Sequence, residues 1–470
     1  MQVFTYSGAR FSPYGDDERP STSDALDSNG DWLAPRATGP LAARVSLPGS
    51  KSLTNRELVL SALADGPSLL RRPLHSRDSM LMVEALRSLG VQIEEVPGDG
   101  AYGPDLRVTP PAELSGSTAI DCGLAGTVMR FLPPVAALAL GPVAFDGDES
   151  ARRRPMRTTV DSLRALGVDV NDDGRGALPF SLWGTGSVRG GEISIDASAS
   201  SQFVSGLLLA APRFTEGLVL RHTGERLPSM PHIEMTIAAL ADRGVTVENP
   251  EPGVWVVPAH PIAGRTIDIE PDLSNAAPFL VAALIAGGTV AVDGWPLSTT
   301  QVGADLETLL PLFGATVRRD GASLVVDGGR GLLGGAVLPG VDLDLSTGGE
   351  LAPAIVALAA LASGPSTITG IGHLRGHETD RLAALAAEIT GLGGHVTELD
   401  EGLAIEPRAL HGGPWRAYED HRMATAGAII GLAVDGVRVD DIGSTAKTLP
   451  QFVELWNGML DQPSVTSERS

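Results

Sequence analysis

The chain repeats one pattern of apolar and polar positions six times. In each copy, a short β-branched run is followed by a small polar or charged cluster, an Ala-, Leu- and Val-rich segment of helical length, and a glycine. The closing glycines are Gly66, Gly141, Gly217, Gly287, Gly364 and Gly436, with spacings of 75, 76, 70, 77 and 72 residues. This period is too long for a helical solenoid and predicts six larger β/α units.

The polar clusters lie where the helices of the six units should begin. Ser, Thr, Asp, Asn and Gly are favoured at that position. The side-chain oxygens of the first four accept hydrogen bonds from the free N–H groups of a helix start. The six openings are GSKSLTNRE (49–57), CGLAGTVMR (122–130), SASSQF (198–203), DLSNAA (272–277), STGGEL (346–351) and EDHRMA (419–424). If the units pack with parallel helices, several positive helix ends converge, which favours an anion site.

Further helices and strands follow from local periodicity. Apolar residues at i, i+3, i+4 and i+7, with a glycine stop, predict helices over 161–168, 232–245 and 380–394. Short apolar runs predict strands at 267–269 and 324–328. The alternation of the two element types predicts an α/β architecture.

Length, charge and cysteine content limit the class of protein. A chain of 470 residues exceeds one core, so we expect two domains of roughly 200 residues each. Its formal charge of −22 argues against nucleic acid or an anionic membrane as partner. No apolar stretch reaches the roughly 18 residues of a membrane span. The single cysteine, Cys122, and the absence of a signal-peptide pattern in MQVFTYSGAR predict a cytoplasmic protein.

Both ends of the chain differ from the repeated region. Residues 1–38 are rich in Ser, Asp, Gly and Pro and have no sustained periodicity. Such a segment cannot bury enough apolar surface to fold, so we expect a disordered extension. We expect residues 461–470 to form a frayed tail.

Two lysines stand out among the basic residues. Of 35 Lys and Arg residues, only Lys51 and Lys447 are lysine, and both lie beside small-residue turns. Lysine is a compact point charge and arginine a planar fork, so a site that needs the former cannot exchange them. The alternative is chance survival of two lysines under compositional drift. The anion site is favoured because five arginines also lie in or near the openings: Arg56, Arg130, Arg154, Arg381 and Arg422.

Eight motifs, in order, resemble those of the bacterial 5-enolpyruvylshikimate-3-phosphate (EPSP) synthase family. They are LPGSKSLTNRELVLSALADG (47–66), GLAGTVMRF, RRRPMR, SASSQF, LPSMPHIEMT, RGHETDRL, DHRMA and STAKTLP, and they span about residues 41–458. The resemblance implies transfer of the enolpyruvyl group of phosphoenolpyruvate to the 5-hydroxyl of shikimate 3-phosphate, in aromatic amino acid biosynthesis. It also implies a monomer with no metal or organic cofactor.

The same resemblance implies an architecture. The family has the two-domain enolpyruvyl transferase fold, an inside-out α/β barrel with three βαβαββ units in each domain and the site in the cleft. Three units in each of two domains equal the six copies of the pattern. The implied domains are residues 50–271 and residues 39–49 plus 272–460.

The motifs also assign roles position by position. The resemblance implies that shikimate 3-phosphate is bound by Lys51, Ser52, Arg56, Ser200, Ser201, Gln202, Ser229, Glu350 and His377. It implies that phosphoenolpyruvate is bound by Lys51, Gly126, Arg154, Gln202, Arg381, Arg422 and Lys447, with Arg130 as a supporting charge. The implied catalytic residues are Lys51, Glu350 as proton acceptor and Glu378 as second acid. Two carboxyls in different protonation states suit the addition and elimination steps.

Several positions depart from the enterobacterial pattern and resemble an actinobacterial branch. Leu124 and His373 replace asparagine, Glu350 replaces aspartate, His377 replaces lysine, His232 replaces tyrosine, and Phe131 replaces proline. Histidine near neutral pH supplies only part of the charge of a lysine. Gly126 leaves room beside the phosphate of phosphoenolpyruvate, so we expect inhibition by glyphosate.

Other interpretations compete with this assignment. The motif GSKS alone could be an ordinary helix cap, and His421 could be a structural cap. Cys122 could be the loop cysteine of a UDP-N-acetylglucosamine enolpyruvyl transferase, although its apolar neighbours Ile120 and Leu124 predict a buried residue. A third alternative is an inactive repeat scaffold that binds anions.

Overall fold

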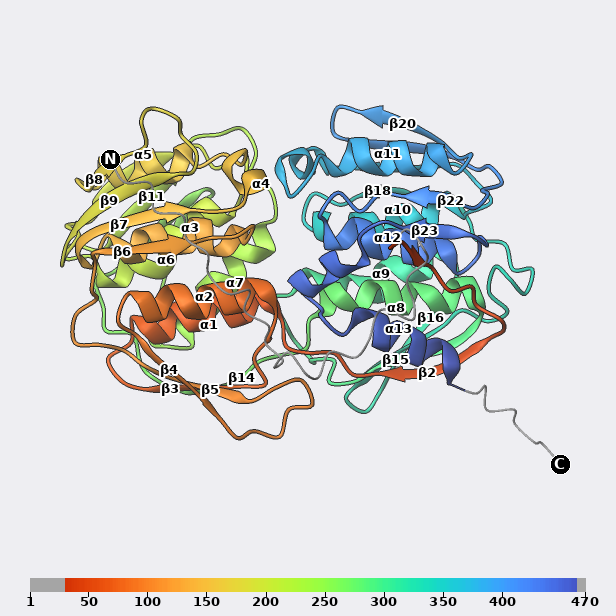
Figure 1. Cartoon of the computed structure of the whole chain (residues 1–470), viewed down its shortest axis with the longest axis horizontal. Helices are drawn as coiled ribbons and strands as arrows, with labels where there is room; N and C mark the ends of the chain where they lie inside the picture. The colour runs from red at the N-terminus through yellow and green to blue at the C-terminus, as the bar shows by residue number, and fades with distance from the viewer. Residues whose placement is uncertain (1–29, 463–470) are drawn as a thin grey trace.

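The computed structural model describes residues 30–462, and the chain forms two halves that lie side by side (Figure 1). Helices α1 to α7 and strands β3 to β14 make up one half. The other half contains β1, β2, α8 to α13 and β15 to β23. Among the described residues, no helix is both long enough and apolar enough to cross a membrane.

One unit shows the repeated architecture in full. Its elements are β6 (Thr118–Asp121), α3 (Gly126–Ala136), β7 (Leu140–Asp146), α5 (Arg157–Ala165), β8 (Asp169–Asn171) and β9 (Phe180–Thr185), with the short α4 (Glu149–Arg152) after β7. The sheet order is β6-β7-β9-β8, with β6 and β7 parallel and the remaining pairs antiparallel. This arrangement is the predicted βαβαββ unit.

Two further units have the same strand order. The first comprises β10 (Gly191–Ile195), α6 (Gln202–Ala210), η2 (Ala211–Arg213), β11 (Leu218–His222), α7 (Met230–Ala241), β12 (Glu248–Glu251) and β13 (Val254–Val257). The second comprises β18 (Asp342–Asp344), η5 (Gly349–Leu351), α10 (Ala352–Ala360), β19 (Ser366–Thr369), η6 (Gly372–Gly376), α11 (Arg381–Gly391), β20 (His395–Leu399) and β21 (Gly402–Glu406). The predicted helices over 161–168, 232–245 and 380–394 correspond to α5, α7 and α11.

Two other units exchange their first strands between the halves. In one, β14 (Thr266–Asp268) pairs with β3 (Ser68–Arg71), and the unit continues with α1 (Lys51–Ala62), α2 (Arg77–Ser88), β4 (Gln92–Val96) and β5 (Asp105–Thr109). In the other, β2 (Leu41–Val45) pairs with β15 (Gly288–Val292), and the unit contains α8 (Leu273–Ala286), η3 (Val302–Asp305), α9 (Leu306–Leu309), η4 (Leu310–Phe313), β16 (Thr316–Asp320) and β17 (Ser323–Asp327). Each first strand therefore pairs in one half and leads into a helix of the other.

The chain crosses between the halves at two adjacent points. Gly49 and Pro271 form an isolated antiparallel bridge there. A Cβ atom on Gly49 would lie 2.4 Å from the carbonyl oxygen of Arg72, so only glycine fits this close approach.

The sixth unit differs from the predicted βαβαββ order. It consists of β22 (Gly413–Trp415), α12 (His421–Gly431), β23 (Val437–Val439), η7 (Ile442–Lys447) and α13 (Phe452–Asp461), without a closing hairpin. The fourth strand position is taken by β1 (Trp32–Leu33), which pairs antiparallel with β23.

This pairing corrects part of the prediction for the N-terminus. We expected residues 1–38 to be disordered, but residues 30–38 are ordered, and Trp32 is only 1% exposed. The physical reason is that β23 offers an unpaired edge and the core below it accepts an indole. The remainder of that prediction, residues 1–29, lies outside the described residues.

The prediction of a tail from residue 461 also needs a small correction. Asp461 is the last residue of α13, and the side chain of Gln462 accepts a hydrogen bond from the backbone N–H of Arg44 at 2.9 Å. Residues 463–470 lie outside the described part of the chain.

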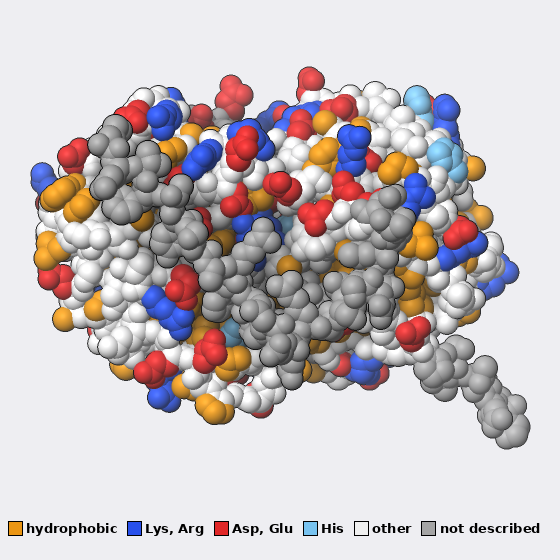
Figure 2. All heavy atoms as spheres, in the orientation of Figure 1, with side chains coloured by type: hydrophobic (Ala, Val, Ile, Leu, Met, Phe, Trp, Pro, Cys, Tyr) orange, Lys and Arg blue, Asp and Glu red, His pale blue; other side chains and the backbone are white. Residues whose placement is uncertain are grey.

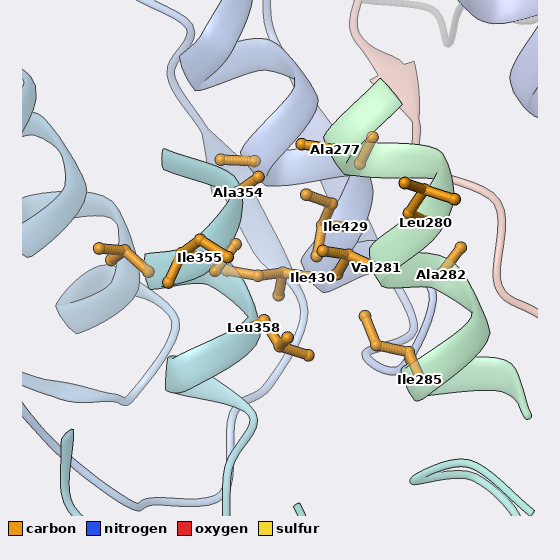
Figure 3. Close-up of a cluster of buried hydrophobic side chains, with 14 of the residues drawn as sticks. Ala277, Leu280, Val281, Ala282, Ile285, Ala354, Ile355, Leu358, Ile429 and Ile430 are labelled. Carbon is orange, nitrogen blue, oxygen red and sulfur yellow. The ribbon is translucent and has the colours of Figure 1, made fainter. Parts of the chain in front are cut away.

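Two separate apolar clusters support the proposed domain bounds. One runs from Leu58 to Ile262, and the other joins residues 32–47 to residues 273–459. Figure 3 shows α8, α10 and α12 packed together in the second cluster, with Val281, Ile355 and Ile430 between them. Every residue of α8 is buried, as expected for a helix that is apolar all round.

Candidate functional site

A cavity of about 300 Å³ lies where the two halves meet, and all six repeat openings contribute to it. Its lining includes Lys51 at the start of α1, Gly126 of α3, Gln202 of α6, Ser274 of α8, Glu350 before α10 and Arg422 of α12. The N-terminal ends of these helices therefore face the same space. Their free N–H groups and dipoles favour an anion there, as the sequence pattern predicted.

The cavity is basic within an acidic protein. Figure 2 shows acidic and basic side chains mixed over the viewed face of both halves. The basic side chains in the lining are Lys51, Arg130, Arg154, Arg381 and Arg422, and the acidic ones are Asp272, Glu350 and Glu378. The local excess of positive charge opposes the formal net charge of −22. A small multiply charged anion fits this environment better than a neutral ligand does.

Most of the predicted site residues line this cavity. They are Lys51, Ser52, Gly126, Arg154, Ser200, Ser201, Gln202, Ser229, Glu350, His377, Glu378, Arg381 and Arg422. Lys447 lines an adjoining cavity of about 410 Å³ instead. Its Nζ donates hydrogen bonds to Glu378 and to the backbone oxygen of Leu124.

Arg56 is placed differently from the other predicted residues. Its side chain is not part of the cavity lining and is only 1% exposed. The guanidinium donates to Thr236 Oγ1, the backbone oxygen of Ser52 and the backbone oxygen of His232, at 2.8 to 2.9 Å. In this arrangement, Arg56 holds the backbone behind the cavity.

Gly126 is required by the packing of the basic side chains. A Cβ atom at this position would lie 2.9 Å from Arg130 Nη1, 3.0 Å from Gln202 Oε1 and 3.1 Å from Arg154 Nη2. Arg130 Nη1 itself donates to Gln202 Oε1 at 3.1 Å, which ties α3 to α6. The absence of a side chain at Gly126 thus leaves the cations free to face the cavity.

Arg381 is held rigidly by a carboxylate that the sequence analysis did not identify. Its Nε and Nη2 donate to the two oxygens of Asp420 at 2.7 and 3.0 Å, and both residues are almost fully buried. Asp420 also caps α12 by accepting from the N–H of Arg422. His421, considered as a cap from the sequence, instead lines the cavity. Neither ring nitrogen has a hydrogen-bond partner among the described residues, although Nδ1 lies 3.6 Å from Asp420 Oδ1.

The two predicted catalytic carboxyls sit among cations. Burial raises the pKa of Glu378, but Lys447, Arg381 and Arg154 outweigh this effect and hold that pKa well below its ordinary value. Burial likewise raises the pKa of Glu350, and its contacts with His232, Arg422 and Ser274 lower it further than burial raises it. Without bound anions, both carboxyls are therefore ionised, which differs from the pair of unlike protonation states expected from the sequence.

The two histidines near Glu378 are neutral. Burial and the charge of Arg381 hold the pKa of His377 well below its ordinary value. The same two causes lower the pKa of His373 to about 4. His377 therefore contributes a polar ring to the cavity and does not replace the charge of a lysine.

Comparison with known proteins identifies the family. A family model described as EPSP synthase (3-phosphoshikimate 1-carboxyvinyltransferase) matches residues 35–456. The chain is 58% identical over 430 residues to a 3-phosphoshikimate 1-carboxyvinyltransferase of Kocuria rhizophila, covering 90% of this chain and 95% of that protein. The chain belongs to the EPSP synthase family.

Solved structures agree with this assignment. An EPSP synthase from Acinetobacter baumannii, 25% identical, superposes with a TM-score of 0.72 over 91% of this chain and 97% of its own. The enolpyruvyl transferase NikO from Streptomyces tendae, 19% identical, gives a TM-score of 0.69 over 90% and 96% of the two chains and shows the shared fold. The predicted two-domain enolpyruvyl transferase fold is thus confirmed.

One residue separates this EPSP synthase family member from the nucleotide-sugar alternative. Cys122 is fully buried, and burial together with Asp121 and Asp146 raises the pKa of its thiol. A buried neutral thiol is unreactive, so it cannot serve as an exposed loop cysteine.

In the described part of the chain, no group of three or more His, Cys, Asp or Glu residues is placed to hold a metal ion.

Proposed function

We propose that this chain binds phosphoenolpyruvate and shikimate 3-phosphate together in the cavity and transfers the enolpyruvyl group to the 5-hydroxyl, releasing phosphate. The observation that carries the proposal is the convergence of five basic side chains and two ionised glutamates in one cavity of an EPSP synthase family member. Both substrates are multiply anionic, so joining them requires fixed cations on several sides.

The serine-rich side of the cavity supports a role in binding shikimate 3-phosphate. Ser200, Ser201 and Gln202 lie at the start of α6, and Ser229 lies just before α7. We assign these residues, with Lys51 and Ser52, to the phosphate and hydroxyl groups of that substrate. Arg56 supports this side from behind through its contacts with Ser52 and His232.

The arginine-rich side supports a role in binding phosphoenolpyruvate. Arg154, Arg381 and Arg422 line it, and Gly126 gives the ligand room to approach the start of α3. Guanidinium groups hold carboxylates and phosphates by paired hydrogen bonds, which also orient them. Lys447 contributes a point charge through its contact with Glu378.

We assign the proton transfers to the two glutamates. Glu350 accepts the proton of the 5-hydroxyl while the oxygen attacks C2 of phosphoenolpyruvate, and Glu378 delivers a proton to the methylene carbon. The resulting tetrahedral intermediate returns a methyl proton to the now ionised Glu378, and the electron pair of that C–H bond restores the C=C bond as the C–O bond to phosphate breaks. Delivery by Glu378 requires prior protonation, and anionic ligands favour it by neutralising Lys447 and Arg381.

A phosphate-release assay tests the proposal. Purified protein is given phosphoenolpyruvate with shikimate 3-phosphate, and in parallel with UDP-N-acetylglucosamine. We expect phosphate release only with shikimate 3-phosphate. Release only with the nucleotide sugar would assign the other enolpyruvyl transfer, and binding of both ligands without release would support an inactive scaffold.

The proposal includes a cytoplasmic location and a monomeric state, the latter measurable by light scattering.

A further inference from the structure

His232 reaches across the cavity to the proposed proton acceptor. It is the third residue of α7, in the half opposite to Glu350, and its Nε2 lies 3.7 Å from Glu350 Oε2. The two side chains have similar exposure, 19% and 20%, so the pair is largely shielded from water. At this distance, a protonated imidazole and a carboxylate form an ion pair.

The backbone of His232 is fixed in place by three donors. Its carbonyl oxygen accepts from Arg56 Nη2 at 2.8 Å, Thr236 Oγ1 at 3.0 Å and Ser205 Oγ at 3.3 Å. The turn before it is constrained as well, because Ser229 adopts a left-handed conformation with φ of 53°. The N–H of Ser229 donates to Ser346 in the other half at 3.3 Å. The imidazole is thus presented from a rigid support.

The remaining groups around Glu350 come from several elements. Ser274 Oγ of α8 donates to Oε1 at 2.6 Å, and Arg422 Nη2 of α12 donates to Oε2 at 3.3 Å. Asp272, the N-cap of α8, acts on it as a like charge, while Arg56 of α1 and Arg381 of α11 act as opposite charges. His232 also acts electrostatically on a second histidine, His373 of η6.

The partners of the Glu350 carboxylate come from both halves of the molecule. Ser274 and Arg422, which hydrogen-bond the carboxylate, belong to the same half as Glu350. Among the described residues, His232 is the side chain of the other half within ion-pair distance of it. The carboxylate therefore has its complete set of partners only when the two halves are together.

We infer that His232 is a positioning residue, which orients the carboxylate of Glu350 and pairs with it when the halves close on the substrates. This role rests on the proposed function. When the halves separate, the imidazole moves away and the Glu350 carboxylate loses one of its partners. Proton abstraction by Glu350 is therefore linked to closure of the two halves. Burial has the largest effect on the pKa of Glu350 and raises it, and the charge interaction with His232 has the next largest effect and lowers it.

Steady-state kinetics of three single variants test the role. His232→Phe keeps a planar ring but removes the donor, so we expect kcat to fall about 10- to 100-fold with little change in either KM. The acid side of the kcat profile should move to higher pH because the carboxylate loses a partner that favours its ionised form. His232→Tyr, which restores a neutral donor, should recover part of kcat. His260→Phe, at an exposed histidine, should resemble the wild type.

A double-mutant cycle decides whether His232 acts through Glu350. In a Glu350→Gln background, His232→Phe should cause little further loss, because the group it positions is already absent. Independent, multiplicative losses would overturn the inference. A raised KM for shikimate 3-phosphate with unchanged kcat would also overturn it, because it would make His232 a direct substrate ligand. The urea midpoint of each variant shows whether it folds.

A spectroscopic arm separates this inference from the proposed function. Infrared titration of the Glu350 carboxyl, assigned with Glu350→Gln, should show protonation at higher pH in His232→Phe than in the wild type. This measurement needs no turnover. If the wild type released no phosphate, the proposed function would fail, and the titration would still decide whether His232 controls Glu350. An unchanged titration would overturn the inference.

Discussion

At the scale of single residues, Glu350 has contacts on both carboxylate oxygens and is ionised at neutral pH. Glu350→Gln keeps the shape but removes the base. We therefore expect kcat to fall roughly 100- to 10,000-fold, the usual contribution of a general base, while binding of both substrates stays close to wild type. Phosphate-release kinetics and calorimetric binding measure the two effects, with Glu454→Gln on the exposed face of α13 as control.

Gly126 offers a test of the cation cluster. Gly126→Ala places a methyl group against Arg130, Gln202 and Arg154, whose side-chain ends must move away from the cavity. We expect the KM for phosphoenolpyruvate to rise about tenfold, equivalent to about 1.4 kcal/mol of lost binding. Gly458→Ala is the matched control, since a Cβ atom there meets nothing within 4 Å. Equal kinetics of the two variants would contradict the prediction.

Glu378 leads to a prediction about protons. Lys447, Arg381 and Arg154 hold its pKa low in the absence of ligands. Phosphoenolpyruvate neutralises those cations, so the pKa of Glu378 should rise and the complex should take up protons. The uptake should grow as the pH falls toward the pKa of the complex. Calorimetry in buffers of different ionisation enthalpy measures it, and Glu378→Gln should abolish it.

Motif and charge reasoning located most of this site because its residues follow helix starts. Lys51, Gln202 and Arg422 are each found from an opening that the apolar pattern reveals. The roles of Asp420 and Arg56 could not be predicted in this way. An Asp before a helix is typical of a cap, and an Arg in the same motif as Lys51 suggests a second substrate ligand. Their roles are seen only from their contacts in the structure, which are with Arg381 for Asp420 and with the backbone oxygen of His232 for Arg56.

At the scale of elements, β1 pairs with the edge of β23 that would otherwise be open. Trp32 is 1% exposed and packs into the same cluster as α8 and α12, whereas its neighbour Leu33 is 52% exposed. Trp32→Ala should lower the free energy of unfolding by about 3 to 5 kcal/mol through lost burial and a cavity. Leu33→Ala should change it little. Urea denaturation with unchanged m-values checks both.

The unit structure was predictable from the local pattern, whereas the halves to which β2 and β14 belong were predictable only from the family resemblance, which joined residues 39–49 to residues 272–460. Glycine spacing and helix openings reveal six copies of a pattern that depends on local sequence. Pairing of β2 with β15 and of β14 with β3 depends on how the halves cross at Gly49 and Pro271, which no local signal encodes. For β1, two residues in a Ser- and Pro-rich stretch are too short for periodicity.

At the scale of the whole molecule, buried neutral histidines make stability depend on pH. The folded-state pKa values of His373, about 4, and of His377 and His421 lie below the unfolded value of about 6.5. The unfolded chain therefore binds more protons, so this stability is complete above about pH 6.5 and is lost toward pH 4. Each group contributes a slope of up to about 1.4 kcal/mol per pH unit.

Urea midpoints between pH 8 and pH 5 measure this dependence. His421→Gln should flatten the profile, because one of the titrating groups is removed. His260→Gln, at an exposed histidine, should leave it unchanged. A wild-type midpoint that is constant over this range would contradict the prediction.

The contact between Arg44 and Gln462, near the two limits of the described residues, also bears on synthesis of the chain by the ribosome. Residues 50–271 supply every helix and strand of the half that contains α1 to α7, so that half can form while translation continues. The other half begins with β1 and β2, yet Arg44 meets Gln462, 418 positions away, only after the last helix is made. At ordinary elongation rates, this delay is about 20 to 80 s. β2 can pair with β15 once residue 292 has been made, but Trp32 stays without Val439 of β23 for nearly the whole of that time, so we expect its indole to remain exposed on the nascent chain.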